Sequence, residues 1–170
     1  MQLVSGELHV RIVDFEGKLV KEAIQQVSVP GLSSQVYLQW PLSDLGGADN
    51  TDTAREGVVA ELVVDGKSIS RNPIYLVPTK QVHLPEAHIN TELTQATEAY
   101  HLKLSSPVLA RGVYVTFGAA SAELSDNYFD LLPSETADVI LKSHETLDAL
   151  KANLHVVSLA DAFKAPNLSE

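Results

Sequence analysis

Acidic residues are the first candidates for chemistry in this 170-residue chain, which carries 22 Asp and Glu against 12 Lys and Arg. Glycoside hydrolysis needs two carboxyl groups about 5–5.5 Å apart for retention, or about 6.5–9.5 Å apart for inversion. The acids here lie mostly in turns or at polar positions of alternating segments, where a carboxylate is normally solvated. No Gly-x-Ser-x-Gly elbow for a serine nucleophile occurs either. The sequence therefore predicts no catalytic residue.

Metal ligation is the second candidate chemistry. The run Asp49-Asn50-Thr51-Asp52 offers oxygen ligands for Ca²⁺, but it lacks the glycine and the distal glutamate of an EF-hand loop. Asp126, Asn127 and Asp130 offer similar ligands, although Asp126 and Asn127 are already explained as turn residues. We expect both groups to serve turns, with no metal and no cofactor bound.

The histidines add one weak metal signal. Only His83 and His88 have a spacing seen in zinc sites, and no cysteine or second close histidine pair completes that set. We therefore expect histidines on the surface or at strand edges, namely His9, His83, His88, His101, His144 and His155.

Aromatic side chains are the third candidate, because the apolar faces of sugar rings stack on flat rings. Tyr37, Trp40 and Tyr128 are the candidate carbohydrate contacts. Trp40 alternates in phase with Val36 and Leu38, which favours a place in the core, whereas Tyr37 is out of phase and is expected to be exposed. For Tyr128 we favour anchoring of a loop through its hydroxyl over contact with sugar.

Composition excludes several other classes of function. The formal charge of −10 and the pI near 4.9 argue against nucleic acid, which calls for clustered Lys and Arg. No stretch approaches the roughly 20 apolar residues that cross a membrane, and no signal peptide is visible. The chain has no cysteine, which is compatible with the cytoplasm but leaves the compartment of this expected soluble protein undetermined.

Strands must position these residues, because period-two alternation dominates the first half. Residues 7–14 predict a half-buried strand that turns at Gly17 and returns over about 19–29. Residues 36–40 predict a third strand before Pro41, and 43–56 the longest loop. A hairpin follows through Asp65-Gly66 and ends near Val77, so the first half supplies about five strands.

The second half continues the same pattern after a connector over 78–86, which is bracketed by Pro78 and Pro85. Alternation predicts strands near 89–93, 100–104, 113–117, 128–132, 139–141 and 154–159. One short helix is expected before the last strand, with Ser143 as its cap and Leu147, Leu150 and Leu154 at helical spacing. Strands recurring every 8–12 residues predict an all-β antiparallel sandwich architecture.

The block Ser125-Asp-Asn-Tyr-Phe-Asp-Leu-Leu-Pro-Ser-Glu135 is the most specific sequence motif. It resembles the closing Ig-like domain of β-mannosidases of the family-2 glycoside hydrolase type, in which a very similar DNYFDLLPGE run occurs. VDFEGK at 13–18, SRNPIYLVPTK at 70–80, LARGVYVTF at 109–117 and LHVVSLADAF at 154–163 extend the resemblance in the same order. Ser134 stands where the family usually has glycine, which argues against a positive-φ turn there.

The resemblance implies two consecutive Ig-like domains, over 1–80 and 81–170, with the first lacking its opening strands. It also implies a non-catalytic accessory region that packs on the catalytic barrel of a β-mannosidase-like parent. A sheet edge left without neighbours recruits other strands, so a second copy of the chain is another expected partner. A carbohydrate-binding module and a protein-interaction or adhesion module are the alternative functions.

Overall fold

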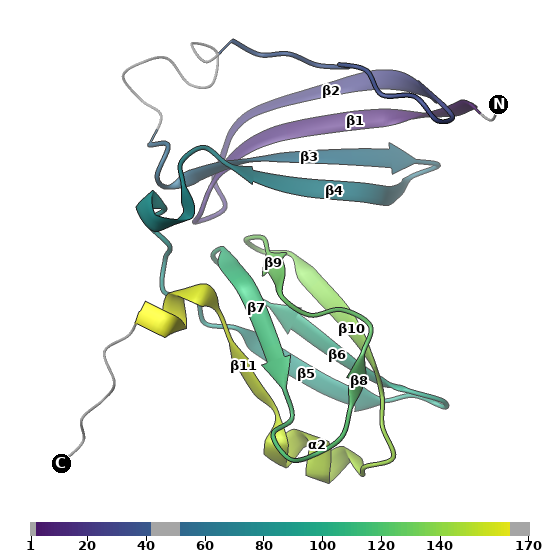
Figure 1. Ribbon diagram of the computed structural model, residues 1–170, viewed down its shortest axis with the longest axis vertical. Helices are drawn as coiled ribbons and strands as arrows, with labels where there is room; N and C mark the ends of the chain where they lie inside the picture. Colours follow the sequence, from purple (N-terminus) through teal and green to yellow (C-terminus); the bar gives the residue numbers. More distant parts are fainter. Residues whose placement is uncertain (1–2, 42–51, 164–170) are drawn as a thin grey trace. The chain divides into compact units, whose positions relative to one another are not determined.

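The computed structural model describes residues 3–41 and 52–163, which fold into antiparallel sheets with three short helical segments (Figure 1). The chain divides into two compact units, Met1–His83 and Leu84–Glu170. The boundary predicted from sequence lay between residues 80 and 81. None of the helices in the described ranges is long and apolar enough to cross a membrane. The predicted all-β Ig-like class is confirmed.

The first unit is built on one four-stranded sheet. Its strands are β1 (Leu3–Asp14), β2 (Leu19–Pro30), β3 (Glu56–Val64) and β4 (Lys67–Tyr75), in the spatial order β2-β1-β3-β4. Both predicted hairpin turns are confirmed, with Gly17 at φ 93° and with Asp65 and Gly66 at φ 50° and 73°. A single 3-10 turn, η2 (Thr79–Gln81), follows β4.

Burial in this unit is confined to a few side chains. Val10 and Ile12 of β1 are buried as the alternation predicted, and Phe15, Val27 and Val59 join them. Large hydrophobic side chains of β2 and β4 remain exposed, including Ile24 at 56% and Ile69 at 55%. The described residues therefore cover the sheet of the first unit only in part.

The predicted strand over residues 36–40 is wrong. No strand forms there, and Val36 is 78% exposed. Alternation alone does not make a strand, because each one also needs a hydrogen-bonded neighbour. The predicted core position of Trp40 is wrong as well, since the indole is only half-buried and the Lys21 ammonium lies 4.6 Å from the ring centroid. The first half thus supplies four described strands, not five.

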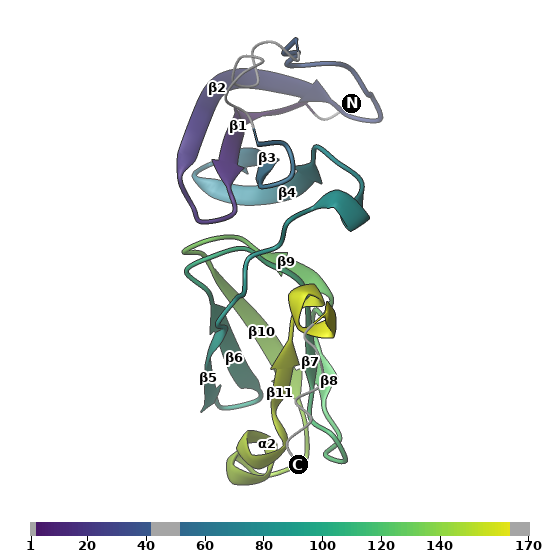
Figure 2. The same cartoon turned by 90° about the vertical axis from the view of Figure 1, so that its left-hand side faces the viewer.

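The second unit has two sheets. One has the order β5-β6-β10-β8, formed by β5 (Asn90–Gln95), β6 (Tyr100–Ser105), β10 (Thr136–Lys142) and β8 (Glu123–Leu124). The other has the order β11-β7-β9, formed by β11 (His155–Val157), β7 (Ala110–Thr116) and β9 (Phe129–Leu131). Both views show the two layers of this unit (Figures 1 and 2). Seven strands in two layers match an Ig-type sandwich.

Alternating side chains fill the space between these layers. The cluster includes Leu102, Leu104, Val113 and Leu141, each fully or almost fully buried. Leu150 of the helix α2 (Leu147–Asn153) closes the core at 0% exposure. The predicted helical spacing of apolar residues is confirmed. The predicted cap is wrong, because Thr146 Oγ1 accepts the Ala149 N–H while Ser143 Oγ donates to the Ser121 carbonyl.

Three details of the second unit differ from the sequence predictions. The strand predicted over 128–132 covers only Phe129–Leu131, because Tyr128 has φ 61°. The strand predicted over 154–159 ends at Val157 and passes into the 3-10 helix η3 (Leu159–Phe163). The expectation against a positive-φ turn after Pro133 is wrong, since Ser134 has φ 61° and its N–H bonds the Ser106 carbonyl.

Candidate functional site

The Ser125–Glu135 block contacts both sheets of the second unit and contains strand β9 of the smaller one. Ser125 pairs with Ile140 of β10 through two hydrogen bonds, in which its N–H donates to the Ile140 carbonyl at 2.9 Å and its Oγ accepts the Ile140 N–H at 3.0 Å. The side chain and the backbone of Ser125 together extend the hydrogen-bond ladder of β10 by one position. The first residue of the block is therefore tied to the larger sheet.

Asn127 ties the block to the other sheet. Its Oδ1 accepts the Val115 N–H at 2.9 Å, and its Nδ2 donates to the Val115 carbonyl at 2.9 Å. The amide thus satisfies both backbone groups of one β7 residue, as a neighbouring strand would. Asp130 adds a further bond, because its Oδ1 accepts the Gly112 N–H at 2.7 Å.

These contacts correct the simple turn interpretation of the block. Asp126 does bond locally, since its Oδ1 accepts the Asn127 N–H at 2.8 Å. Ser125 and Asn127, however, reach strands distant in the sequence, which local turn chemistry does not indicate. In the sequence, the only indication of these contacts was that an asparagine amide can pair with the backbone groups of a strand. Which strand the amide reaches can be seen only in the fold.

Tyr128 is displayed at the surface by this arrangement. Asn127 Oδ1 also accepts the Tyr128 N–H at 3.0 Å, which fixes the residue in its left-handed conformation. The phenol ring stacks on Tyr114, with centroids 4.8 Å apart and planes 23° apart, yet 70% of Tyr128 is exposed. Desolvation raises the pKa of Tyr128, and the neighbouring Tyr114 hydroxyl raises it further.

The other two candidate sugar contacts, Tyr37 and Trp40, lie in the first unit. The Tyr37 hydroxyl donates to the Ser28 carbonyl at 3.3 Å, so this half-buried side chain holds residues 31–41 beside β2. Trp40 has one ring face occupied by Lys21. The three predicted contact residues therefore form no common site within either unit.

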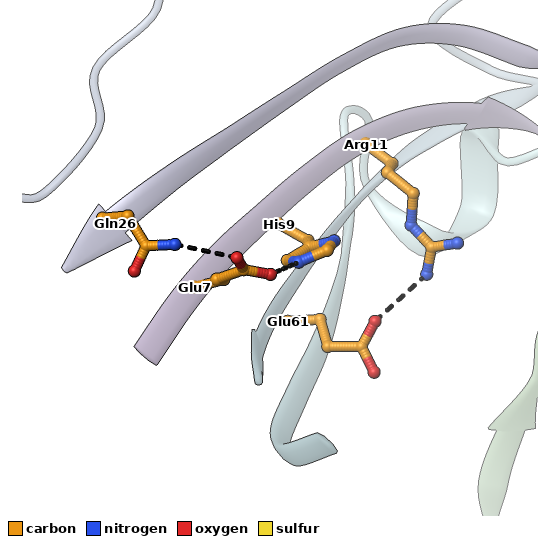
Figure 3. Close-up of polar contacts among 5 residues, drawn as sticks. All are labelled: Glu7, His9, Arg11, Gln26 and Glu61. Atoms are coloured by element: carbon orange, nitrogen blue, oxygen red, sulfur yellow. Dashed lines mark hydrogen bonds and ion pairs between the residues drawn. The ribbon is translucent and has the colours of Figure 1, made fainter. Parts of the chain in front are cut away.

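A polar cluster covers part of the sheet in the first unit (Figure 3). Glu7 accepts from Gln26 Nε2 at 2.8 Å and contacts His9 Nε2 at 3.2 Å, while Arg11 Nη2 donates to Glu61 at 3.5 Å. These residues are cross-strand neighbours on β1, β2 and β3, so their register brings them together. Each carboxylate already has a partner, which suits stabilisation of the sheet.

Glu56 is the one buried carboxylic acid among the described residues. It is 6% exposed, and its Oε2 has no hydrogen-bond partner within the described ranges. Burial raises the pKa of Glu56, and the nearby charges of Asp14 and Asp52 raise it further, against the lowering effects of a backbone hydrogen bond and Lys18. Asp52 Oδ1 accepts the Ala54 N–H, so the described end of the run 49–52 serves a turn, while residues 49–51 lie outside the described ranges.

The remaining described acids and histidines make separate local contacts. Within the described ranges, no group of three or more His, Cys, Asp or Glu side chains is placed to hold a metal ion. His101 contacts Asp138 at 3.1 Å across β6 and β10, and the His83 N–H donates to the Ala54 carbonyl. A shallow groove of about 590 Å³ in the second unit is lined by Glu98, Glu123, Glu145, Lys142, His144 and two serines.

Comparison with protein families places each unit in a domain class. Residues 1–81 match the model of the mannosidase Ig/CBM-like domain, and residues 84–162 match the Ig-fold domain of the mannosidase type. Together the two matches span nearly the whole chain. The chain therefore belongs to these two families of Ig-like β-mannosidase domains, arranged in that order.

One solved structure is similar over most of this chain. The crystal structure of β-D-mannosidase from Dictyoglomus thermophilum matches with a TM-score of 0.77 and 21% identity, covering 93% of this chain and 19% of that chain. At this identity the likeness establishes the fold. The chain spans about one fifth of the length of that mannosidase. Comparison with curated proteins found no match.

Proposed function

We propose that this chain is the accessory region of a β-mannosidase-like glycoside hydrolase, packing on a catalytic barrel without performing the chemistry. The observation that carries the proposal is the order of the two mannosidase-type domains, which match residues 1–81 and 84–162. The similar mannosidase structure supports it, because most of that longer chain lies outside the matched part. A fold alone does not assign function, so the residues must also fit.

The described side chains fit an accessory role. The most specific motif is used to join two sheets, through Ser125, Asn127 and Asp130. Glu7 and Glu61 are paired with neighbouring polar groups. Glu56 has a raised pKa, as a general acid would, but it stands at the start of β3, and the acids that raise its pKa are Asp14 and Asp52, of which Asp14 pairs with it across β1. Glycoside hydrolysis needs a positioned pair in a sugar-sized cleft.

Two measurements test the proposal. The isolated chain is expected to show no turnover of a nitrophenyl β-mannoside, and turnover abolished by Glu56→Gln would refute the proposal. If the reading frame upstream encodes a barrel domain, joining the chain to that barrel is expected to raise the temperature at which the barrel unfolds. No change in barrel stability or activity would also count against an accessory role.

A carbohydrate-binding module is the second candidate, favoured by the CBM-like description of the family that residues 1–81 match. Tyr37 and Trp40 are its proposed contacts in this unit. Saturable binding of mannose oligosaccharides that is lost in Trp40→Ala, with the fold retained, would support it. Three further expectations stay predictions. They are the protein-interaction alternative, self-association through an exposed strand edge, and the loss of opening strands from the first domain.

A further inference from the structure

The outer face of the sheet β11-β7-β9 gathers aromatic and polar side chains. Val113 and Val115 of β7 point into the core, so Tyr114 and Thr116 point to the opposite face. In the register of β7 and β11, Val157 lies opposite Tyr114 and His155 lies opposite Thr116. Residues on directly paired positions share a face, so all four side chains lie on this outer face.

Tyr128 completes this face from the segment before β9. Its ring stacks on Tyr114, while Val157 beside Tyr114 is 44% exposed. We call Tyr114, Thr116, Tyr128, His155 and Val157 the outer platform. It consists of one stacked, exposed phenol ring, an aliphatic neighbour and two polar side chains.

The conformation of Tyr128 is costly and is imposed by its surroundings. A non-glycine residue at φ 61° lies in the left-handed region, which costs roughly 1–2 kcal/mol for an L-residue. Asn127, itself held by both backbone groups of Val115, fixes it there through the Tyr128 N–H. Such strain persists where the structure over-determines it and is concentrated at functional sites. The result is a rigid aromatic ring presented to solvent.

The size and polarity of the platform indicate its ligand. A stable protein interface buries about 800 Å² on each partner, far more than one phenol ring and one valine provide. A pyranose ring has one apolar C–H face about as large as a phenol ring, with hydroxyl groups at its rim. His155 and Thr116 carry groups that donate and accept hydrogen bonds on the adjoining strands. Asp126 beside Tyr128 and the net charge of −10 disfavour an anionic sugar.

We propose that the outer platform binds one pyranose ring of a neutral saccharide, stacked on Tyr128 and hydrogen-bonded by His155 and Thr116. Because the Tyr128 ring is already stacked on Tyr114, little rotamer entropy is lost when the sugar binds. One sugar ring stacked on Tyr128 and a few neutral hydrogen bonds give a millimolar dissociation constant. Such weak binding suits a site that adds to a second saccharide contact made elsewhere. This inference does not depend on packing against a catalytic barrel.

The experiment is an NMR titration of the 170-residue chain with β-1,4-mannobiose. Saturable shifts of the Tyr114 and Tyr128 ring signals and of the Val157 methyl signals are expected. Tyr128→Asn removes the ring, yet asparagine tolerates a positive φ, so the fold should persist while the Val157 shifts disappear. His155→Ala should weaken binding by about threefold, as expected for the loss of one neutral hydrogen bond.

The control variant is Ile24→Ala, which removes an exposed apolar side chain from β2 of the first unit and should leave the shifts of the second unit unchanged. Absence of saturable shifts, or shifts that persist in a folded Tyr128→Asn variant, would overturn the inference. Should Tyr128→Asn fail to fold, Val157→Asp serves instead, because it places a charge beside the stacked ring and should abolish the Tyr128 shifts. Neither result alters the assay of barrel stability, so failure here is distinguishable from failure of the accessory role.

Discussion

Both units match mannosidase-type Ig-like domains, but they enclose very different cores. Within the described ranges, the first has one sheet of long strands of 12, 12, 9 and 9 residues, with Val10, Ile12, Phe15, Val27 and Val59 as its buried hydrophobic residues. The second has seven shorter strands in two layers around a much larger cluster. Strand length therefore says little about how much apolar surface a β domain buries.

The difference shows what the second layer provides. A sheet with one layer leaves residues such as Ile24 and Ile74 at 56% and 48% exposure, although they sit in well-paired strands. In the second unit, Ser125 and Asn127 connect the two layers by hydrogen bonds, and one sheet closes each face of the core. Hydrogen bonding between strands organises both units, whereas the amount of apolar surface buried between layers distinguishes them.

Matched leucine substitutions on interior strands give the largest expected effect. Leu102→Ala should lower the free energy of unfolding of the second unit by about 2–5 kcal/mol, because Leu102 is 0% exposed and leaves a cavity. Leu62→Ala, in a half-buried position on β3, should cost the first unit only about 1 kcal/mol. Denaturant unfolding followed by Trp40 fluorescence reports the first unit, and NMR signals of β6 report the second. Equal losses would remove the distinction between the units.

Loss of the Asn127 amide should be the next largest effect. Asn127→Ala removes both side-chain hydrogen bonds to the Val115 N–H and carbonyl, at about 0.5–1.5 kcal/mol net for each bond. The matched control is Asn72→Ala on exposed β4, which should change the stability of the first unit by less than about 0.5 kcal/mol. Amide hydrogen exchange at Val115 is the direct measurement. Unchanged protection there would show that the amide does not substitute for a strand.

Ser134→Gly should stabilise the second unit by about 1 kcal/mol. The substitution relieves a left-handed conformation at φ 61° and keeps the N–H bond to the Ser106 carbonyl. Ser134→Ala is the control and should give no gain, because alanine has the same backbone restriction. Thermal unfolding compared with wild type measures both, and a lower midpoint for the glycine variant would contradict the expectation.

The smallest effect is a pH dependence specific to the first unit. The folded-state pKa of Glu56 is raised above 4.5, so the folded state holds its proton more tightly than the unfolded state. Stability of this unit should therefore fall as the pH rises from 4.5 through the raised pKa. Glu56→Gln should remove this pH dependence, so the first unit of the variant should gain stability relative to the wild type at neutral pH. Trp40 fluorescence during unfolding at a series of pH values measures it, and parallel profiles would contradict it.

Much of the fold followed from local patterns. The Gly17 and Asp65-Gly66 turns, the alternation of Leu102 and Leu104, and the helical spacing of Leu147 and Leu150 were confirmed, because each depends on nearby residues. The strand at 36–40 failed because its pattern says nothing about whether a neighbouring strand exists. The cap at Thr146 was missed because Ser143 offered an equivalent hydroxyl three residues earlier.

The candidate site was less predictable. Tyr128 was named from its residue type, but its stacking on Tyr114 depends on where β7 lies, and its positive φ depends on Asn127. The outer platform combines residues of β7, β11 and the segment before β9, which only the strand order brings together. Ser134 shows the opposite case, because its φ is positive although the glycine that usually indicates such a turn is absent.

The bonds of Asn127 also bear on how samples of this protein age. Asparagine deamidates when the next backbone nitrogen attacks its side-chain carbonyl, a step that needs freedom in both groups. Here the carbonyl oxygen is held by two N–H donors and the next residue is a bulky tyrosine. Folded protein should therefore keep this amide during storage, while partly unfolded protein loses it. Once converted to aspartate, the side chain would face the Val115 carbonyl as an anion and hinder refolding.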